Sequence, residues 1–503
     1  MAKSTVFNLS HNVTGSGDMG YVMPIAAYDV VPGEKIHHKV HALLRTQALI
    51  APIMHTVDID LDAYFVPDRL VWEDAEVFHS GGDDGLAAPE LPTMEYPSTG
   101  YPVGSLADML GLPVVSYNNN DVDDVVPVTS SNARPHSALL FRAYTKVVND
   151  YYRDSQLQPE APMSLASGLD TTTNRNLLRP CWKRDYFTKA RPQPQLGPEV
   201  VLPFSGSMPI SADGPIRFEN SGGSAAMNVG GSGYGPVTVE GNMNSDPLTY
   251  QEGLIGDLDD VAGISIRDQR ESNAVQRFLE FNNNWGGRYI EQVWARFKAR
   301  VPDYRLDRPE FLGTGSAKFQ FSEVLNTAGI DDPVGSMSGH GISLLGSNKF
   351  RYRTPEHGHI IVMLVIRPKA QYMQGQHRMW NRKTKFDFLL PEFAHIGDQA
   401  IENRELFVNH PNPEQTFGFT PIYDEYRTIP SRVFGEFRTT QRMWHMARMF
   451  AGAPALNSTF VECVPTDRIF PVETRLASSV LMNISHKISA RRMLPKFPNP
   501  RLM

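Results

Sequence analysis

Short strand-like segments, set far apart between long connectors rich in glycine and proline, constrain this chain more than any other feature. Residues 57–65 alternate apolar and polar side chains, which predicts a half-buried strand with one acidic, solvated face. Residues 359–367 form an apolar run that predicts a strand covered on both faces, and residues 480–485 alternate again. The chain of 503 residues contains 39 glycines and 38 prolines, which interrupt these patterns repeatedly. Few strands and long connectors favour a β-sandwich or barrel with long loops.

Apolar stripes at helical spacing predict a few helices within those loops. The four stripes lie in residues 137–152, 275–279, 290–297 and 443–450. They are typical of core contacts rather than of a cofactor-binding motif. They do not alternate regularly with the strands, which argues against a doubly wound α/β sheet.

Cysteine content and hydropathy exclude several classes of protein. The two cysteines, Cys181 and Cys463, are too few for a disulfide framework or a zinc ribbon. Residues 1–12 lack the apolar core of a secretory signal peptide, so none is expected. The longest apolar run, residues 360–366, is far shorter than a membrane span, so no membrane insertion is expected.

Charge is distributed unevenly along the chain. The formal net charge of -7 is the sum of -9 over residues 1–204, -7 over residues 205–260 and +9 over residues 261–503. The overall value therefore conceals a basic half, and by itself it does not exclude a nucleic-acid partner.

The middle segment, residues 205–260, also differs in composition. It holds 11 of the 39 glycines and only scattered apolar residues, so it is predicted to be a long, acidic, solvent-facing insertion. A flexible loop and a protruding contact surface remain equally open. No Lys-Ser/Thr pair follows its glycine run, which argues against a phosphate-binding loop. The candidate residues of an exterior protrusion are Gly230, Gly231, Gly233, Tyr234 and Gly235.

No enzymatic chemistry is predicted. An EF-hand beginning at Asp58 would need Gly and Glu where the chain has Ala63 and Arg69. No nucleophile elbow is present, and neither cysteine has a catalytic context. Two histidine groups are too small to complete a metal site, namely His37, His38 and His41, and Glu356, His357 and His359. The sequence therefore predicts no catalytic residue, no metal site and no cofactor.

Two basic segments suit single-stranded nucleic acid. Residues 487–503 carry basic side chains without an acidic one, and residues 379–388 mix basic with aromatic side chains. Cations can pair with phosphates while rings stack on bases. The alternative is a solvated or subunit-contacting basic surface. The candidate interior DNA contacts are Lys487, Arg491, Arg492, Lys496, Arg501, Trp380, Arg382, Lys383 and Lys385.

Blocks spread over roughly 400 residues, in order, resemble one family. They include HTVDIDLDAYFVPDRLVW (55–72), LLFRAYTKVVNDYYRD (139–154), KRDYFTKARPQPQLGP (183–198), PDYRLDRPEFLG (302–313), EHGHIIVMLVIRPKAQYMQG (356–375), FDFLLPEFAHIGDQ (386–399), YDEYRTIPSRVFGEF (423–437) and WHMARMFAGAPA (444–455). They are similar to the major capsid proteins of the Microviridae, bacteriophages with circular single-stranded DNA, and in particular of the gokushoviruses. The acidic residues after Trp72, residues 325–328 and the basic C-terminal tail depart from the family pattern.

The resemblance implies a fold and a set of partners. It implies a mainly β protein, with one viral jelly-roll domain over residues 1–503 comprising an eight-stranded antiparallel barrel, long loop insertions and several helices. It also implies sixty copies in a T=1 shell around the DNA, with an acidic exterior. Residues 205–260 would form a threefold protrusion, which is a candidate for contact with a host surface receptor. The charge pattern, rather than the resemblance, predicts that residues 485–503 form a basic C-terminal tail.

The resemblance further implies a scaffolding protein and a small basic DNA-binding protein as partners. Assembly would take place in the host bacterial cytoplasm, and the product would be the virion. A jelly-roll protein that binds or degrades carbohydrate is the alternative from a different functional class.

Overall fold

The computed structural model describes residues 5–80, 87–117, 125–131, 133–195, 307–325, 337–471, 478–494 and 496, with short pieces between residues 210 and 280. The chain divides into two compact units. One consists of Met1–Pro194 with Val301–Met503, and the other of Gln195–Arg300. The second unit is therefore inserted into the sequence of the first, and it contains the predicted insertion at residues 205–260.

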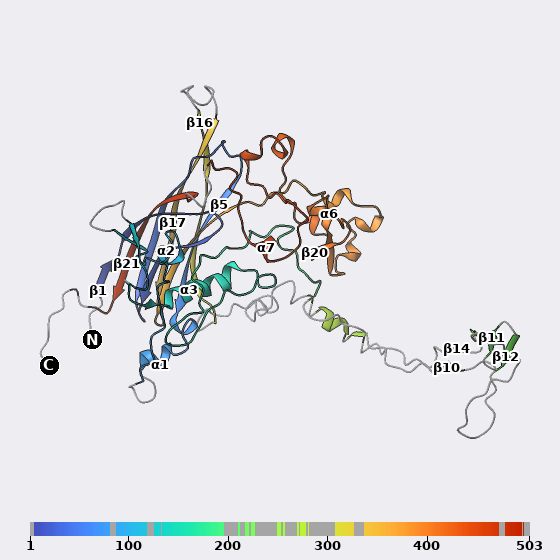
Figure 1. Cartoon of the computed structure of the whole chain (residues 1–503), viewed down its shortest axis with the longest axis horizontal. Helices are drawn as coiled ribbons and strands as arrows, with labels where there is room; N and C mark the ends of the chain where they lie inside the picture. Colours follow the sequence, from blue (N-terminus) through green and yellow to red (C-terminus); the bar gives the residue numbers. More distant parts are fainter. Residues whose placement is uncertain are drawn as a thin grey trace, which may run out of the picture. The chain divides into compact units, whose positions relative to one another are not determined.

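Two antiparallel sheets form the centre of the first unit (Figure 1). The six-stranded sheet has the order β1-β21-β4-β17-β16, and β2 also pairs with β21. Its strands are β1 (Thr5–Asn8), β2 (His11–Gly17), β4 (Lys35–Thr46), β16 (Gln320–Leu325), β17 (Met337–Arg353) and β21 (Val480–Arg492). The four-stranded sheet has the order β15-β5-β18-β3, with strands β3 (Val22–Val30), β5 (Val57–Pro67), β15 (Glu310–Lys318) and β18 (Gly358–Pro368).

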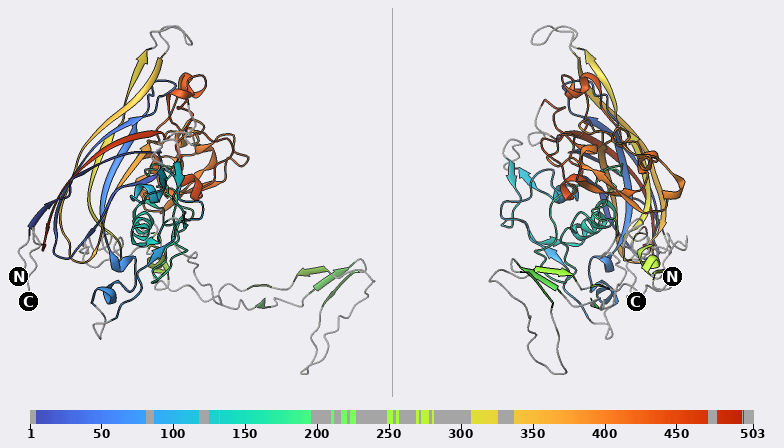
Figure 2. Two further views of the ribbon diagram at one scale, coloured as in Figure 1. Left: turned by 60° about the vertical axis from the view of Figure 1, so that its left-hand side comes forward. Right: turned by 90° about the vertical axis from the view of Figure 1, so that its right-hand side faces the viewer.

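Short helices and two-stranded ladders occupy the connections of this unit (Figure 2). The helices are α1 (Ala75–Ser80), α2 (Leu106–Met109), α3 (Leu139–Val147), α6 (Asn403–Leu406) and α7 (Ser458–Val461). The ladders pair β6 (Thr93–Met94) with β9 (His136–Ser137), β7 (Val115–Tyr117) with β8 (Val125–Pro127), and β19 (Asp398–Glu402) with β20 (Thr416–Pro421). No helix among the described residues is long and apolar enough to cross a membrane.

The second unit is described only in short pieces. It contains β10 (Ile210–Ser211) paired with β14 (Ile255–Gly256), and a sheet of order β12-β11-β13 made of β11 (Arg217–Asn220), β12 (Gly223–Ala226) and β13 (Thr249–Glu252). Residues 272–277 are helical and overlap the second predicted stripe, residues 275–279, at residues 275–277. The third stripe, residues 290–297, lies outside the described residues.

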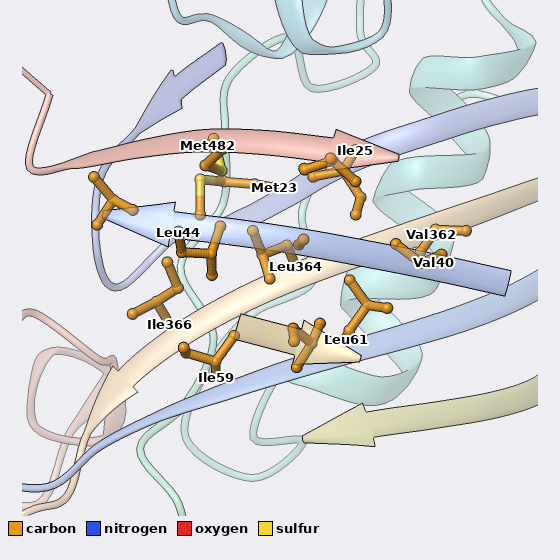
Figure 3. Close-up of a cluster of buried hydrophobic side chains, with 14 of the residues drawn as sticks. Met23, Ile25, Val40, Leu44, Ile59, Leu61, Val362, Leu364, Ile366 and Met482 are labelled. Atoms are coloured by element: carbon orange, nitrogen blue, oxygen red, sulfur yellow. The ribbon is translucent and has the colours of Figure 1, made fainter. Parts of the chain in front are cut away.

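The six-stranded sheet is buried on one face. Along β4 and β21, buried and exposed residues alternate almost without exception, because successive side chains of a strand point to opposite faces. The inner side chains pack against the inner face of the four-stranded sheet, as Figure 3 shows for Val40, Leu44 and Met482 facing Leu61 and Leu364. The outer face of the six-stranded sheet is left free to carry polar groups.

The four-stranded sheet is covered on both faces. Nearly every residue of β18 is buried, which confirms the strand predicted at residues 359–367. Its second face packs against α3 and neighbouring loops, and the Tyr144 hydroxyl donates a hydrogen bond to the Val22 carbonyl, 2.9 Å away. The predicted helix 137–152 is confirmed as α3 followed by one π-helical turn, Val148–Tyr152.

The aspartates of β5 are only partly exposed and are engaged by other side chains, so the prediction of a freely solvated face is wrong. Asp58 and Asp60 lie 3.1 and 3.0 Å from the Lys183 ammonium, and Asp60 also lies 2.7 Å from the Arg367 guanidinium. Asp62 accepts a hydrogen bond from the Tyr152 hydroxyl. The acidic face is instead engaged in ion pairs and a hydrogen bond with residues distant in sequence.

The helix predicted at residues 443–450 is also absent. Residues 442–444 form one 3-10 turn, and residues 445–450 have no regular secondary structure. Their backbone groups are hydrogen-bonded to distant side chains instead. The Arg468 guanidinium donates to the carbonyls of His445 and Ala447, and the Phe450 amide donates to the Gln374 side chain. These tertiary hydrogen bonds replace the helical ones.

Candidate nucleic-acid interface

The outer face of the six-stranded sheet is strongly basic. The period of two along β4, β17 and β21 places every second side chain of each strand on this face. None of these outward residues is acidic in the described part of the strands. The basic face, as we call it, carries eight exposed cations, which are Lys35, Lys39, Arg45, Lys349, Arg351, Arg353, Lys487 and Arg491.

The register of the three strands places like charges opposite one another. Lys39 is paired with Lys349 on one side and with Lys487 on the other. Further along the same strand, Lys35 is paired with Arg353 and with Arg491. Like charges directly opposite in a sheet are destabilising, so two rows of three cations cost folding free energy that an anion would recover.

A recess of about 780 Å³ lies on this side of the sheet, lined by residues of β1, β4, β17 and β21 that include Lys39, Lys349, Arg351 and Lys487. The pKa of the neighbouring His41 is lowered, first by desolvation and then by the charges of Lys39 and Lys487. The recess is therefore lined by several cations and has a positive potential.

The structure places the predicted C-terminal contacts in different positions. Residues 485–492, predicted as the start of a tail, are the end of β21, and Lys487 and Arg491 lie on the basic face. Arg492 points to the other side, where its Nε donates to the buried Glu34 carboxylate at 2.6 Å. Lys496 lies beyond the strand, and Arg501 lies outside the described residues.

The DNA contacts predicted within residues 380–385 do not lie on the basic face. They belong to the connection between β18 and β19, which carries the 3-10 helices η3 (Arg378–Trp380) and η4 (Lys385–Asp387). Figure 1 shows this loop region, around α6 and β20, on the opposite side of the first unit from β21. The structure therefore does not unite the two sets of predicted contacts.

Arg382 is already engaged within the chain. Its guanidinium lies over the rings of Phe388 and Tyr426, 5.0 and 4.7 Å from their centroids, and 3.6 Å from the Glu425 carboxylate. Lys383 and Lys385 are exposed. The prediction that this segment contacts DNA stays a prediction, and for Arg382 such a contact would require breaking the intramolecular one.

The predicted protrusion residues, Gly230, Gly231, Gly233, Tyr234 and Gly235, lie outside the described residues. Their role in a contact surface stays a prediction.

Sequence reasoning missed six of the eight cations of the basic face, those on β4 and β17. A signal was available, because residues 35–46 alternate Lys35, His37 and Lys39 with apolar or buried positions. Residues 349–353 show the same alternation of basic and aromatic side chains. What the sequence could not show was that these strands are neighbours of β21.

The basic face could bind an anion through its cations, and the two cysteines of the chain lie elsewhere. Burial raises the pKa of Cys181 to about 11 and that of Cys463 to about 12, so both thiols stay protonated at neutral pH. In the described part of the chain no group of three or more His, Cys, Asp or Glu side chains is placed to hold a metal ion. The arrangement suits binding of a polyanion.

Comparisons with known proteins all identify capsid proteins as similar to this chain. The family model described as "Capsid protein (F protein)" matches residues 1–502. The chain is 30% identical over 482 residues to capsid protein VP1 of Bdellovibrio phage phiMH2K, covering 91% of this chain and 87% of that protein. It is 29% identical over 553 residues to capsid protein VP1 of Chlamydia phage 1, covering 93% and 90%, and 30% identical over 495 residues to capsid protein VP1 of Spiroplasma virus 4, covering 90% and 87%.

Proposed function

The chain belongs to the capsid protein (F protein) family of phages, and from this premise we propose that sixty copies of it form a T=1 icosahedral shell around a circular single-stranded DNA genome. It is a structural component of the virion rather than an enzyme, since the relatives named above are capsid proteins. Many copies in a closed shell follow from the family. The number sixty and the T=1 geometry are the proposal.

The sheet orders support an eight-stranded jelly roll. One sheet contains β2-β21-β4-β17 and the other β3-β18-β5-β15. Along the chain the strands alternate between the sheets from β2 to β5, and again from β15 through β17 and β18 to β21. A chain that passes between two four-stranded antiparallel sheets in this order forms a jelly roll, the architecture of many viral capsid proteins.

Genome contact through the basic face is the central part of the proposal. The observation that carries it is the pair of cation rows at Lys39 and Lys35, because like charges held opposite one another favour a bound polyanion. The proposal places this face toward the DNA and adds the tail beyond β21 as a further contact. Trp380, Lys383 and Lys385 remain a second candidate contact.

The remaining partners are proposed on the family resemblance. A small basic DNA-binding protein would share the neutralisation of the genome, and a scaffolding protein would guide assembly in the host bacterial cytoplasm. Residues 205–260 would form the threefold protrusion and contact a host surface receptor. The acidity of this segment suits an outward position, away from packaged phosphate.

Electron microscopy of the purified protein or of native particles tests the proposal. Closed shells of one size, each accounting for sixty copies, are the expected result. Shells of another copy number would overturn the T=1 geometry. The alternative, a carbohydrate-active jelly roll, would give no shells; no observation favours it.

A further inference from the structure

A second surface of the first unit exposes large apolar side chains. It lies in the connection between β18 and β21, and six of its residues are more than half exposed, with Ile429, Phe434 and Trp380 at 80%, 77% and 70%. Contiguous exposed apolar area of this kind is typical of protein contact sites. The six residues are Trp380, Phe386, Phe388, Ile396, Ile429 and Phe434.

Shared neighbours connect several of these residues, and the others lie on the same connection of the chain. Trp380 and Ile429 line the same recess of about 590 Å³. Phe388 shares the Arg382 guanidinium with Tyr426, and the Tyr426 hydroxyl accepts a hydrogen bond from the Leu389 amide at 3.3 Å. The same connection carries more exposed cations than exposed acids, and Arg432 and Arg438 line the recess. The cations are Lys383, Lys385, Arg427, Arg432, Arg438 and Arg442, and the acids are Asp387, Glu392 and Glu436. We call it the basic apolar surface.

A surface of opposite charge lies around α1. The Glu73 amide donates to the Leu165 carbonyl at 3.0 Å, and the Thr93 amide donates to the Gly168 carbonyl at 2.9 Å, which joins three segments of the chain. This acidic apolar surface exposes Phe78, Leu91, Leu165 and Leu169 together with Glu73, Glu76, Glu90 and Glu95. Like the first surface, it combines apolar area with charges of mainly one sign.

We propose that the basic apolar surface of one copy docks onto the acidic apolar surface of the next copy in the shell. The inference rests on the proposed function, because it names the contact through which the proposed shell would close. Figures 1 and 2 show α1 and α6 well apart within the first unit, so the two surfaces do not meet in one copy. A contact between two different patches is head-to-tail, which generates closed rings of the kind found around symmetry axes.

The occupant is a second copy rather than DNA on two grounds. The exposed apolar area exceeds what base stacking on one or two rings would use, and Arg382 is held by Glu425 and two rings instead of facing outward. The acidic apolar surface would repel phosphate but complements the six exposed cations of the other surface.

Charge reversal with rescue tests the contact. The double variant Lys383→Glu/Lys385→Glu, produced as the full chain, is expected to form at least about tenfold fewer shells, because glutamates would then face the glutamates of the acidic apolar surface. A tenfold change in association corresponds to about 1.4 kcal/mol. Adding Glu73→Lys/Glu76→Lys to the same chain is expected to restore shells, since the charges are then exchanged across the contact. The conservative variant Lys383→Arg/Lys385→Arg should assemble like the wild type.

The outcomes separate the competing interpretations. Normal assembly of the Lys383→Glu/Lys385→Glu variant, or failure of the glutamate reversals to rescue it, would overturn the docking proposal. Shells that form normally but package less DNA would assign the surface to the genome instead. A wild-type chain that forms no shells even when it is produced together with the scaffolding protein would contradict the proposed function itself.

A separate variant tests the apolar part of the proposed contact. Phe434→Asp changes a side chain that is 77% exposed, so the thermal unfolding midpoint of the unassembled subunit should be unchanged while shell formation is abolished. Wild-type assembly by this variant would contradict the proposal.

Discussion

At the scale of single residues, Arg142 shows how one buried charge fastens a helix to the rest of the unit. It is fully buried in α3, and its Nε lies 2.8 Å from the Asp170 carboxylate. Its other nitrogens donate to the carbonyls of Val71 and Ala166. The sequence block that contains Arg142 is one of those that resemble the capsid family, and the structure gives this residue a role in packing rather than in binding.

Replacing Arg142 by Met should destabilise the subunit by about 3–5 kcal/mol, because Asp170 would be left buried without its cation. The measurement is the shift of the urea unfolding curve. The matched control on the same helix is Lys146→Met, which removes a partly exposed pair with Asp150 and should cost about 0.5 kcal/mol. Equal losses of stability in the two variants would contradict this account.

A second residue-scale feature is a buried histidine pair. His38 Nε2 lies 3.1 Å from His486 Nδ1, and His38 Nδ1 lies 3.1 Å from the Tyr28 hydroxyl. Burial, followed by neighbouring histidines, lowers the pKa of His38 to about 3 and that of His486 to about 4. Both values lie below the ordinary value of about 6.5 that applies in the unfolded chain.

Because the unfolded chain therefore takes up more protons, the stability that this pair contributes is full above pH 6.5 and is lost as the pH falls toward 3. The unfolding midpoint of the wild type should decrease below pH 6.5. His38→Asn should be less stable at pH 7.5 and should lose less stability between pH 6.5 and 4.5. Parallel pH profiles for the two proteins would contradict the assignment.

At the scale of elements, β4 is the central strand of the basic face. It has β17 on one side and β21 on the other, so Lys35 and Lys39 are each paired with a cation on both sides. Stability and binding therefore oppose each other on this strand, because the repulsion that binding relieves is present in the free sheet.

Lys35→Gln/Lys39→Gln should consequently raise the unfolding midpoint of the subunit while lowering its affinity for single-stranded DNA. The salt dependence of binding should also weaken, by roughly 0.7 in log–log slope for each phosphate that the variant no longer neutralises. Lys318→Gln, on β15 of the other sheet, is the control. It removes the cation that is paired opposite Asp58, so it should leave the DNA affinity unchanged and should not raise the unfolding midpoint. A variant that is less stable and also binds DNA more weakly would argue against the charge rows.

At the scale of the whole molecule, the division into two compact units suggests a division of labour. The two sheets that build the core belong to the first unit, while residues 205–260 belong to the second. Replacing residues 205–260 by a short Gly-Ser linker should therefore leave shell formation intact. Adsorption of the particles to host cells should be abolished, and undiminished adsorption would contradict the receptor role proposed for the insertion.

Much of the local structure could be predicted from the sequence, because the burial of a strand follows from the alternation of its own residues. The strands at residues 57–65, 359–367 and 480–485 were found in this way, and the helical stripe at residues 137–152 likewise. The stripe at residues 443–450 failed, because Arg468 and Gln374 supply hydrogen bonds that local spacing cannot reveal.

The sequence by itself determined the family, the mainly β class and the basic character of the second half of the chain. Only the tertiary structure decided that Lys39 lies between Lys349 and Lys487, and that Asp60 forms ion pairs with Lys183 and Arg367. The physical reason is that strand neighbours and ion pairs join residues hundreds of positions apart. Their geometry depends on how the two sheets pack, which no local pattern records.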